Sequence, residues 1–218
     1  MLNDLARRTE WHRYYSDKRI VQQWKQFDLV GRYHHGGAIL EIGPHLGLVT
    51  ACLVNAGYMV ETLDLFARQF AAPAVGHITA DLRTLDPEVI AKYDTILCCE
   101  MLEHIHWDET DAVLGRLIRR DRRLIISVPY EGFQIFFQGY LNGHTARHMF
   151  QWRKLRAMRH FAKGPDDDRP ETHKWEVGYR GYSLACWESK LRKSGWRILA
   201  REFTSPTRSV FHVLNAAD

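Results

Sequence analysis

Ala38-Ile39-Leu40-Glu41-Ile42-Gly43-Pro44-His45-Leu46-Gly47 is the stretch on which the fold of this 218-residue chain depends. Its apolar first half is typical of a buried strand, and a helical pattern follows it to about Ala56. The two glycines allow a tight turn between strand and helix, and they let a ligand approach the backbone closely. The stretch therefore predicts a ligand-binding turn at the end of a strand.

Further strand patterns follow at regular intervals, separated by amphipathic helical patterns. They cover Tyr58 to Leu63, Ile78 to Asp81, Asp94 to Cys99, Arg123 to Val128, Trp196 to Phe203 and Val210 to Leu214. Helices are expected over Asp108 to Arg120 and Leu184 to Ser194. Apolar strands that alternate with helices predict an α/β fold, a doubly wound and mostly parallel seven-stranded sheet with helices on both faces.

The regions around this core suggest how one domain is arranged over residues 1–218. Residues 1–30 carry an amphipathic helical pattern that would pack on the core or form an N-terminal helical lid, and Gly31 to Gly37 breaks it. We expect a cofactor-binding core over 38–130, a substrate-side insertion or lid over 131–172, and a C-terminal helix with strands over 173–218.

Composition limits the class of protein. The 45% hydrophobic content is that of an ordinary globular chain, and the net charge of +4 is too small to indicate nucleic acid by itself. Charged residues between Met1 and Glu10 argue against a secretory signal, so we expect a cytoplasmic protein. The four cysteines lack the spacing of a zinc knuckle or a disulfide framework: Cys52, Cys98, Cys99 and Cys186.

Acidic residues follow the second and third strand patterns. Asp64 comes at the end of the second, where its carboxylate could accept both hydroxyls of a ribose, and Asp81 ends the third. Helix capping or solvation is the alternative role for both carboxylates. The set of Gly43, Gly47, Asp64 and Asp81 resembles the class I S-adenosylmethionine-dependent methyltransferases, over residues 38–130 well and over 173–214 loosely.

That resemblance implies that the glycine loop holds the methionine portion of S-adenosylmethionine, that Asp64 holds the ribose, and that Asp81 lies near the adenine. It also places further residues beside the cofactor: Glu41, His45, Leu65, Leu82 and Cys99. Pro44, His45 and Leu46 stand where the family usually has more glycines, so His45 is expected to adopt an unusual backbone conformation or to touch the cofactor. A nicotinamide enzyme is the alternative, but the loop lacks G-x-G-x-x-G.

Three polar residues follow the fourth strand pattern: Glu100, Glu103 and His104. A helical turn at this point would place all three on one face. The segment resembles the Glu-x-x-Glu-His of the quinone-biosynthesis O-methyltransferases, which also carry a His-x-Trp-Glu segment like residues 173–176 here. The resemblance implies a divalent-metal site for Mg, Mn or Zn, built from Glu100, Glu103, His104 and His173.

Such a site suits O-methylation, because a bound cation lowers the pKa of a hydroxyl and fixes its oxygen near the methyl group. Without a metal, Glu100 would cap the next helix or bind the cofactor's amino group, and His104 or His173 would be the general base. Residues 144–152 also loosely resemble the small-RNA terminal 2'-O-methyltransferases, with His148 as the fourth ligand. Gln151 replaces the acid of that motif, and we rank nucleic acid below a small-molecule acceptor.

The insertion is aromatic and basic, with no acidic residue between Glu131 and Asp166. Residues 133–163 have the pattern of an interfacial helix that rests on an anionic bilayer as a peripheral contact, or of a lid helix over an aromatic pocket. We therefore expect an S-adenosylmethionine-dependent O-methyltransferase for a small, aromatic or lipophilic acceptor. A cofactor-binding partner protein without catalytic activity is the alternative from another class.

Overall fold

The computed structural model describes residues 4–68, 70, 75–131, 133–141, 143–152, 161, 169–204 and 209–217. In 4–5, 133–138, 140–141 and 144–152 the description covers the backbone alone. Among the described residues, no helix is long and apolar enough to cross a membrane.

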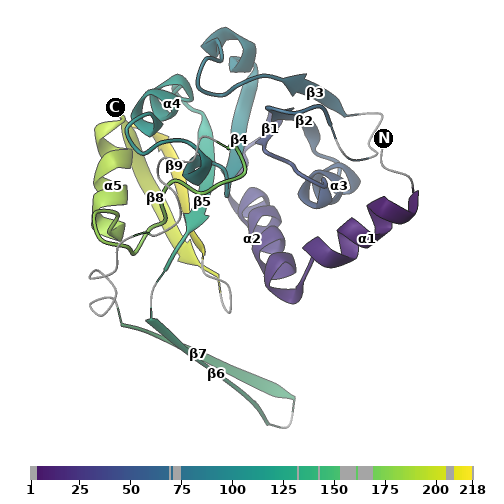
Figure 1. The fold of residues 1–218 in the computed structure, drawn as a ribbon, viewed down its shortest axis with the longest axis vertical. Coiled ribbons are helices and arrows are strands. Elements are labelled where there is room, and N and C mark those ends of the chain that lie inside the picture. The colour runs from purple at the N-terminus through teal and green to yellow at the C-terminus, as the bar shows by residue number, and fades with distance from the viewer. Residues whose placement is uncertain are drawn as a thin grey trace.

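A seven-stranded sheet forms the centre of the molecule, in the order β3-β2-β1-β4-β5-β9-β8 (Figure 1). The first five strands pair in parallel, β9 runs antiparallel to β5, and β8 runs antiparallel to β9. The strands are β1 Ala38–Ile42, β2 Met59–Asp64, β3 Gly76–Thr79, β4 Tyr93–Cys99, β5 Arg123–Pro129, β8 Trp196–Phe203 and β9 Ser209–Ala216. The doubly wound, mostly parallel sheet predicted from the sequence is confirmed.

Helices cover both faces of the sheet. On one face, α2 (Asp17–Tyr33) and α3 (Leu48–Asn55) pack on apolar side chains of the central strands, and α1 (Asp4–Tyr14) precedes α2. On the other face lie α4 (Thr110–Arg116) and α5 (Leu184–Lys193). Cys98 and Cys99 pack on opposite faces, as side chains in neighbouring strand positions must. Two short 3-10 turns, η1 (Pro87–Ile90) and η2 (Leu102–His104), complete the helical elements of the described chain.

The topology determines where a ligand binds. The neighbouring strands β1 and β4 are followed by helices on opposite faces, α3 after β1 and α4 after β4. In open parallel sheets this reversal opens a crevice beyond the carboxyl ends of the strands. The loop 43–47 follows β1, and Glu100, Glu103 and His104 follow β4, so both predicted parts of the site begin at this crevice.

Two sequence expectations need correction. Gly31 does not begin a break, because α2 continues through it to Tyr33. The insertion is not helical over 133–152: β6 (Phe133–Leu141) and β7 (His144–Trp152) form an antiparallel hairpin that projects away from the main sheet (Figure 1). Residues 153–160 and 162–168 lie outside the described chain.

The physical reason for the hairpin lies in the sequence itself. Phe133, Ile135 and Phe137 recur at every second position, which is the period of a strand. Asn142-Gly143 between the two runs favours a two-residue hairpin turn, and Gly143 has a φ of +82°.

Candidate functional site

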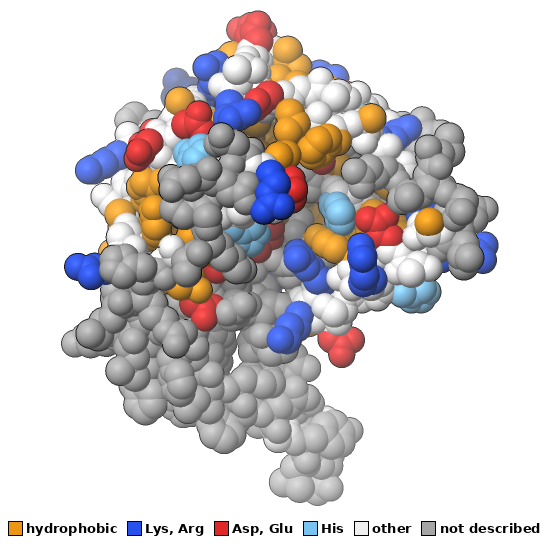
Figure 2. All heavy atoms as spheres, viewed as in Figure 1, with side chains coloured by type: hydrophobic (Ala, Val, Ile, Leu, Met, Phe, Trp, Pro, Cys, Tyr) orange, Lys and Arg blue, Asp and Glu red, His pale blue; other side chains and the backbone are white. Residues whose placement is uncertain are grey.

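A cavity of about 1350 Å³ lies at the carboxyl edge of β1, β2 and β4. Its walls come from the α1–α2 junction, the loop after β1, the ends of β2 and β4, and the segments 129–131 and 170–176. Figure 2 shows acidic, basic and histidine side chains around the hollow in the middle of the viewed face. Every site residue predicted from the sequence lines this cavity, apart from Gly47.

The loop after β1 has the backbone strain that its sequence predicted. His45 has a φ of +48°, in the left-handed region that side chains other than glycine rarely adopt. Gly47 has a φ of +77°, and a Cβ atom there would lie 2.4 Å from Cγ of Phe70. Gly47 thus allows α3 to begin against the Phe70 ring, and its role is packing rather than contact with the cavity.

Glu41 links the strand to the following helix. Its carboxylate is buried, and Thr50 Oγ1 of α3 donates a hydrogen bond to Oε2 at 2.5 Å. Burial raises the pKa of Glu41 to about 7. Glu41 lines the cavity, but its described hydrogen bond serves the packing of α3 on β1.

The two aspartates differ in how they are engaged. Asp64 Oδ1 accepts a hydrogen bond from the Phe66 main-chain N–H at 3.1 Å, and the carboxylate lines the cavity. Asp81 is paired with the Arg83 guanidinium, at 2.7 Å between Oδ2 and Nη2, and it also accepts the Arg83 N–H at 2.9 Å. The pairing of Asp81 agrees with the local loop role that was its alternative from sequence, although Asp81 also lines the cavity. Asp64 Oδ2 has no hydrogen-bond donor among the described residues.

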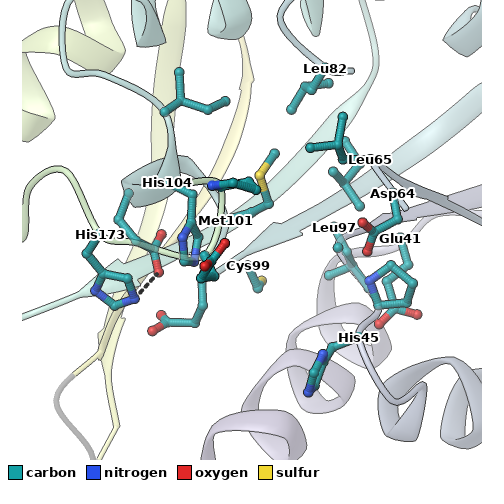
Figure 3. Close-up of a pocket in the computed structure, with 18 of the residues that line it drawn as sticks. Glu41, His45, Asp64, Leu65, Leu82, Leu97, Cys99, Met101, His104 and His173 are labelled. Carbon is teal, nitrogen blue, oxygen red and sulfur yellow. Dashed lines mark ion pairs between the residues drawn. The ribbon is translucent and has the colours of Figure 1, made fainter. Parts of the chain in front are cut away.

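Figure 3 shows the cavity divided into two groups of side chains. His45, Glu41, Asp64, Leu65, Leu82 and Leu97 lie on one side, and His104 and His173 lie on the other, with Cys99 and Met101 between them. We call the first group the nucleotide half, and we call Glu103, His104 and His173 the histidine cluster.

The histidine cluster brings together three of the four residues predicted as metal ligands. One ligand atom from each of Glu103, His104 and His173 lies within 4.8 Å of the others. His173 Nε2 is 3.9 Å from Glu103 Oε1, the contact drawn as a dashed line in Figure 3. Glu100 lines the same cavity but is not part of this group.

The carboxyl group of Glu103 is buried and has no hydrogen bond among the described residues. Its side chain is 0% exposed, and among the described residues neither of its carboxylate oxygens has a hydrogen-bond partner; the same holds for His104 Nδ1. Burial raises the pKa of Glu103 well above its usual value, and burial lowers the pKa of His104 to about 4. A buried carboxylate without donors costs free energy unless a ligand or cation completes it.

Glu100 is held differently. It has a φ of +52°, and Ser127 Oγ of β5 donates a hydrogen bond to its Oε1 at 2.8 Å. Ser209 of β9 and Gln22 of α2 are further hydrogen-bonding neighbours, and Gln22 Nε2 donates to Ser209 Oγ at 2.9 Å. Burial raises the pKa of Glu100, although these donors oppose the shift. The helical turn expected to align Glu100 with Glu103 is replaced by this left-handed residue and the η2 turn.

His173 is fixed by its own segment. Its Nδ1 lies 2.9 Å from Glu176 Oε1, and because a carboxylate only accepts, Nδ1 carries the proton and Nε2 faces Glu103. Lys174 N donates to the Glu103 carbonyl at 2.7 Å, and Trp175 Nε1 donates to the Ile105 carbonyl at 3.0 Å. These bonds join 173–176 to the loop after β4. The sequence contained Glu176 in the His-x-Trp-Glu pattern, but the pattern alone did not indicate this bond.

The residues that sequence reasoning missed come mainly from the α1–α2 junction. Tyr14, Tyr15, Arg19, Gln22 and Gln26 line the cavity. The amphipathic pattern of residues 1–30 predicts which apolar side chains pack on the core, whereas the face of α2 at the cavity is polar. Positions 19, 22 and 26 share a helix face by their spacing, which was the available signal.

Comparison with solved structures identifies the fold. No family model matches the chain, and no curated protein matches it. A solved structure of Burkholderia thailandensis 1,6-didemethyltoxoflavin-N1-methyltransferase, with its substrate and S-adenosylhomocysteine bound, aligns with a TM-score of 0.60 and 18% identity over 97% of this chain and 87% of that one. The chain has the class I methyltransferase fold.

Other methyltransferase structures agree. The glycopeptide N-methyltransferase MtfA, in complex with S-adenosylmethionine, aligns with a TM-score of 0.58 and 12% identity over 93% of this chain and 96% of that one. The CcbJ methyltransferase from Streptomyces caelestis aligns with a TM-score of 0.59 and 11% identity over 94% of this chain and 100% of that one. At these identities the likeness establishes the methyltransferase fold and leaves activity to the site.

Proposed function

We propose that the protein is an S-adenosylmethionine-dependent methyltransferase that acts on an oxygen of a small acceptor. One observation carries the proposal: a single cavity joins the loop after β1 and Asp64 to the buried histidine cluster. The first part matches the place where such folds hold a nucleotide, and the second offers groups that can bind and deprotonate a hydroxyl.

In this proposal the nucleotide half holds the cofactor. Asp64 accepts the ribose hydroxyls, the loop 43–47 lies against the methionine portion, and Leu65, Leu82 and Cys99 border the adenosine. Leu65 is 44% exposed, and an adenine ring would cover it. Asp81 contributes through its pairing with Arg83, which shapes the wall near the adenine.

The histidine cluster fits a divalent cation such as Mg, Mn or Zn. Glu103, His104 and His173 would hold it, because a cation would satisfy the carboxylate oxygens and the imidazole nitrogen that lack described partners. When bound, the ion lowers the pKa of the acceptor hydroxyl and fixes its oxygen. Glu100 already accepts a hydrogen bond from Ser127, so it would contribute negative charge near the cation rather than bind it directly.

The chain's own groups account for the proton. When no cation occupies the cluster, His173 Nε2 has a free lone pair, because Glu176 holds the proton on Nδ1, and Nε2 then accepts the proton of the acceptor hydroxyl. The oxygen then forms a bond to the methyl carbon while the carbon–sulfur bond breaks, and the electron pair stays on sulfur as S-adenosylhomocysteine. His104, with a pKa of about 4, is neutral near pH 7 and would orient the acceptor as a hydrogen-bonding partner.

The acceptor is proposed to be small and aromatic, with polar substituents. Met101, Ile105 and Tyr130 give the cavity apolar surfaces for a ring, while Gln22 and Gln26 favour hydroxyl or amide groups over a purely lipophilic molecule. RNA 2'-O-methylation remains the second candidate, but it needs His148, whose side chain lies outside the described part, and His173 takes the third position in the described cluster. Bilayer contact by 133–163 and a cytoplasmic location stay predictions of the sequence.

Binding and turnover together test the proposal. S-adenosylhomocysteine titrated calorimetrically should bind with an affinity that Asp64→Ala weakens and that Asp108→Ala, an exposed aspartate outside the cavity, leaves unchanged. Transfer of a labelled methyl group should then be screened on matched phenols and anilines, with and without a chelator.

Phenol methylation that falls on chelation and returns with added cation supports the metal-assisted reading. Full activity in chelator would show that the reaction needs no metal, and methylation of anilines alone would show that the acceptor atom is nitrogen rather than oxygen. Cofactor binding without any turnover would favour the non-catalytic alternative. A chain that binds no S-adenosylhomocysteine is not a methyltransferase of this kind.

A further inference from the structure

The loop after β1 has few free main-chain donors. Glycine-rich loops at a helix N-terminus bind anions through exposed N–H groups. Here Gly43 N donates to a β2 carbonyl at 2.8 Å, Pro44 has no N–H, and Gly47 N donates to the Pro44 carbonyl at 2.8 Å. The first N–H of α3, at Leu48, donates to the Tyr15 hydroxyl at 3.2 Å. Of residues 43–48, His45 and Leu46 are left with main-chain N–H groups that have no described acceptor, so a charged donor from outside the loop would strengthen the binding of a carboxylate.

Arg19 is positioned to be that donor. It lies in the first turn of α2 and lines the same cavity as the loop. Its Cζ is 4.6 Å from the centroid of the Tyr14 ring, and its Nη1 donates to the Tyr14 hydroxyl at 3.2 Å. The Tyr14 ring in turn packs on the His45 imidazole, with 4.2 Å between ring centroids. The stack holds the guanidinium above the strained residue of the loop.

Arg19 forms no ion pair among the described residues, although its charge partly offsets the rise that burial causes in the pKa of Glu100. Among the residues that the structure describes, its one hydrogen-bonding partner is the neutral Tyr14 hydroxyl, although a guanidinium has five N–H donors. Two other cations of the cavity are engaged: Arg83 pairs with Asp81, and Lys174 Nζ donates to a main-chain carbonyl at 3.2 Å. A planar guanidinium with free donors is suited to a carboxylate bound through two oxygens.

The rest of the cavity would repel such a carboxylate. Eight acidic residues line its walls: Glu41, Asp64, Asp81, Glu100, Glu103, Glu131, Glu171 and Glu176. An anionic group on a ligand therefore has a favourable position near Arg19 and unfavourable positions near β2 and β4. The proposed cofactor carries one carboxylate, at its amino acid end.

We propose that Arg19 binds the α-carboxylate of the cofactor and that the Tyr14–His45 stack holds it in place. This inference rests on the proposed function. It also explains why this loop functions with Pro44, His45 and Leu46 in place of glycines: an arginine from α2 supplies the donors that the loop has lost.

Paired ligands test the inference. S-adenosylhomocysteine carries the α-carboxylate, whereas 5'-methylthioadenosine keeps the adenosine and the thioether without it. Both are titrated calorimetrically into the wild type, Arg19→Gln, Arg19→Lys and the control Lys18→Gln, which changes the neighbouring cavity-lining cation. Arg19→Gln should weaken S-adenosylhomocysteine about 10- to 100-fold and leave 5'-methylthioadenosine unchanged, as a lost charge-assisted contact does. Arg19→Lys should recover part of the loss.

Each other outcome overturns the inference. If Arg19→Gln weakens both ligands equally, Arg19 has only a structural role, which a lowered melting temperature would show directly. If it changes neither affinity but raises KM for acceptors that carry a carboxylate, the anion comes from the acceptor. If Lys18→Gln has the same selective effect, the contact is general electrostatic attraction. If the wild type binds neither ligand, the proposed function fails, and the inference fails with it.

Discussion

The nucleotide half and the histidine cluster share one cavity, but they differ in how their polar groups are satisfied. In the nucleotide half, Glu41 accepts from Thr50 and Asp64 from a main-chain N–H, and Asp81, which lines the same cavity, accepts from Arg83. In the cluster, both Glu103 oxygens lack described hydrogen-bond partners. Among the described residues, each acid of the first set thus has at least one donor, whereas Glu103 has none. Unsatisfied buried groups therefore indicate the reacting centre more clearly than the acids of the nucleotide half do.

The largest expected effect comes from breaking the cluster. Glu103→Ala should lower kcat by about 10²- to 10⁴-fold, the range for loss of a catalytic acid–base or metal-assisted centre, while affinity for S-adenosylhomocysteine changes less than about twofold. Steady-state kinetics and calorimetry measure the two quantities. Glu109→Ala, an exposed residue near the same loop, is the control. A Glu103→Ala enzyme with near wild-type kcat would show that the buried carboxylate has no part in the reaction.

The reverse pattern should hold in the nucleotide half. Asp64→Ala should weaken S-adenosylhomocysteine about 10- to 100-fold, because a carboxylate that accepts both ribose hydroxyls is lost, while kcat at saturating cofactor falls little. Titration calorimetry gives the affinity, with Asp108→Ala as the control. An unchanged affinity would mean that the ribose lies elsewhere in the cavity.

A smaller effect should come from the residue that orients the cluster. Glu176→Ala removes the hydrogen-bond acceptor of His173 Nδ1. Hydrogen bonds that orient a metal-binding histidine in this way contribute about 10-fold to metal affinity or activity. Nitrogen chemical shifts of His173 should report a protonated Nδ1 in the wild type and a mixture of tautomers in Glu176→Ala. Glu176→Gln, which can still accept, should keep the wild-type tautomer. A wild-type spectrum with protonated Nε2 would contradict the assigned orientation.

The smallest effect concerns stability and pH. Burial raises the pKa of Glu41 from 4.5 to about 7, so the folded protein binds this proton more tightly than the unfolded chain does. The contribution of Glu41 to the free energy of unfolding therefore decreases as pH rises from about 4.5 to 7, by about 3 kcal/mol at most. Denaturant unfolding at pH 5 and pH 8 should show a smaller difference in Glu41→Gln than in the wild type. If the variant and the wild type show the same difference in unfolding free energy, groups other than Glu41 cause the pH dependence.

The same contrast explains what the sequence could predict. The strands, the left-handed His45 and the placement of Asp64 follow from local patterns, because each depends on residues within one strand–turn–helix unit. The cluster depends on the contact of His173 with Glu103, in a loop some 70 residues earlier, and local spacing could not reveal a contact over that separation. The left-handed Glu100 could not be foreseen either, since hydrogen bonds from β5, β9 and α2 hold it there.

The hairpin was mispredicted for a different reason. Aromatic and basic residues are compatible with an amphipathic helix by composition, and the two-residue period with Asn142-Gly143 was the stronger signal for strands. The apolar residues of α2 indicate only the side of the helix that packs on the core. Arg19 and Gln22 lie on its cavity side, which the apolar pattern does not predict.

A crystal structure of the protein grown with S-adenosylhomocysteine and Mn²⁺ tests the central claim most directly. We predict density for the ribose at Asp64, the sulfur directed toward the histidine cluster, and an anomalous peak for manganese among Glu103, His104 and His173. Nucleoside density outside this cavity, or a sulfur directed away from the cluster, would contradict the account of one cavity with a nucleotide half and a reacting half.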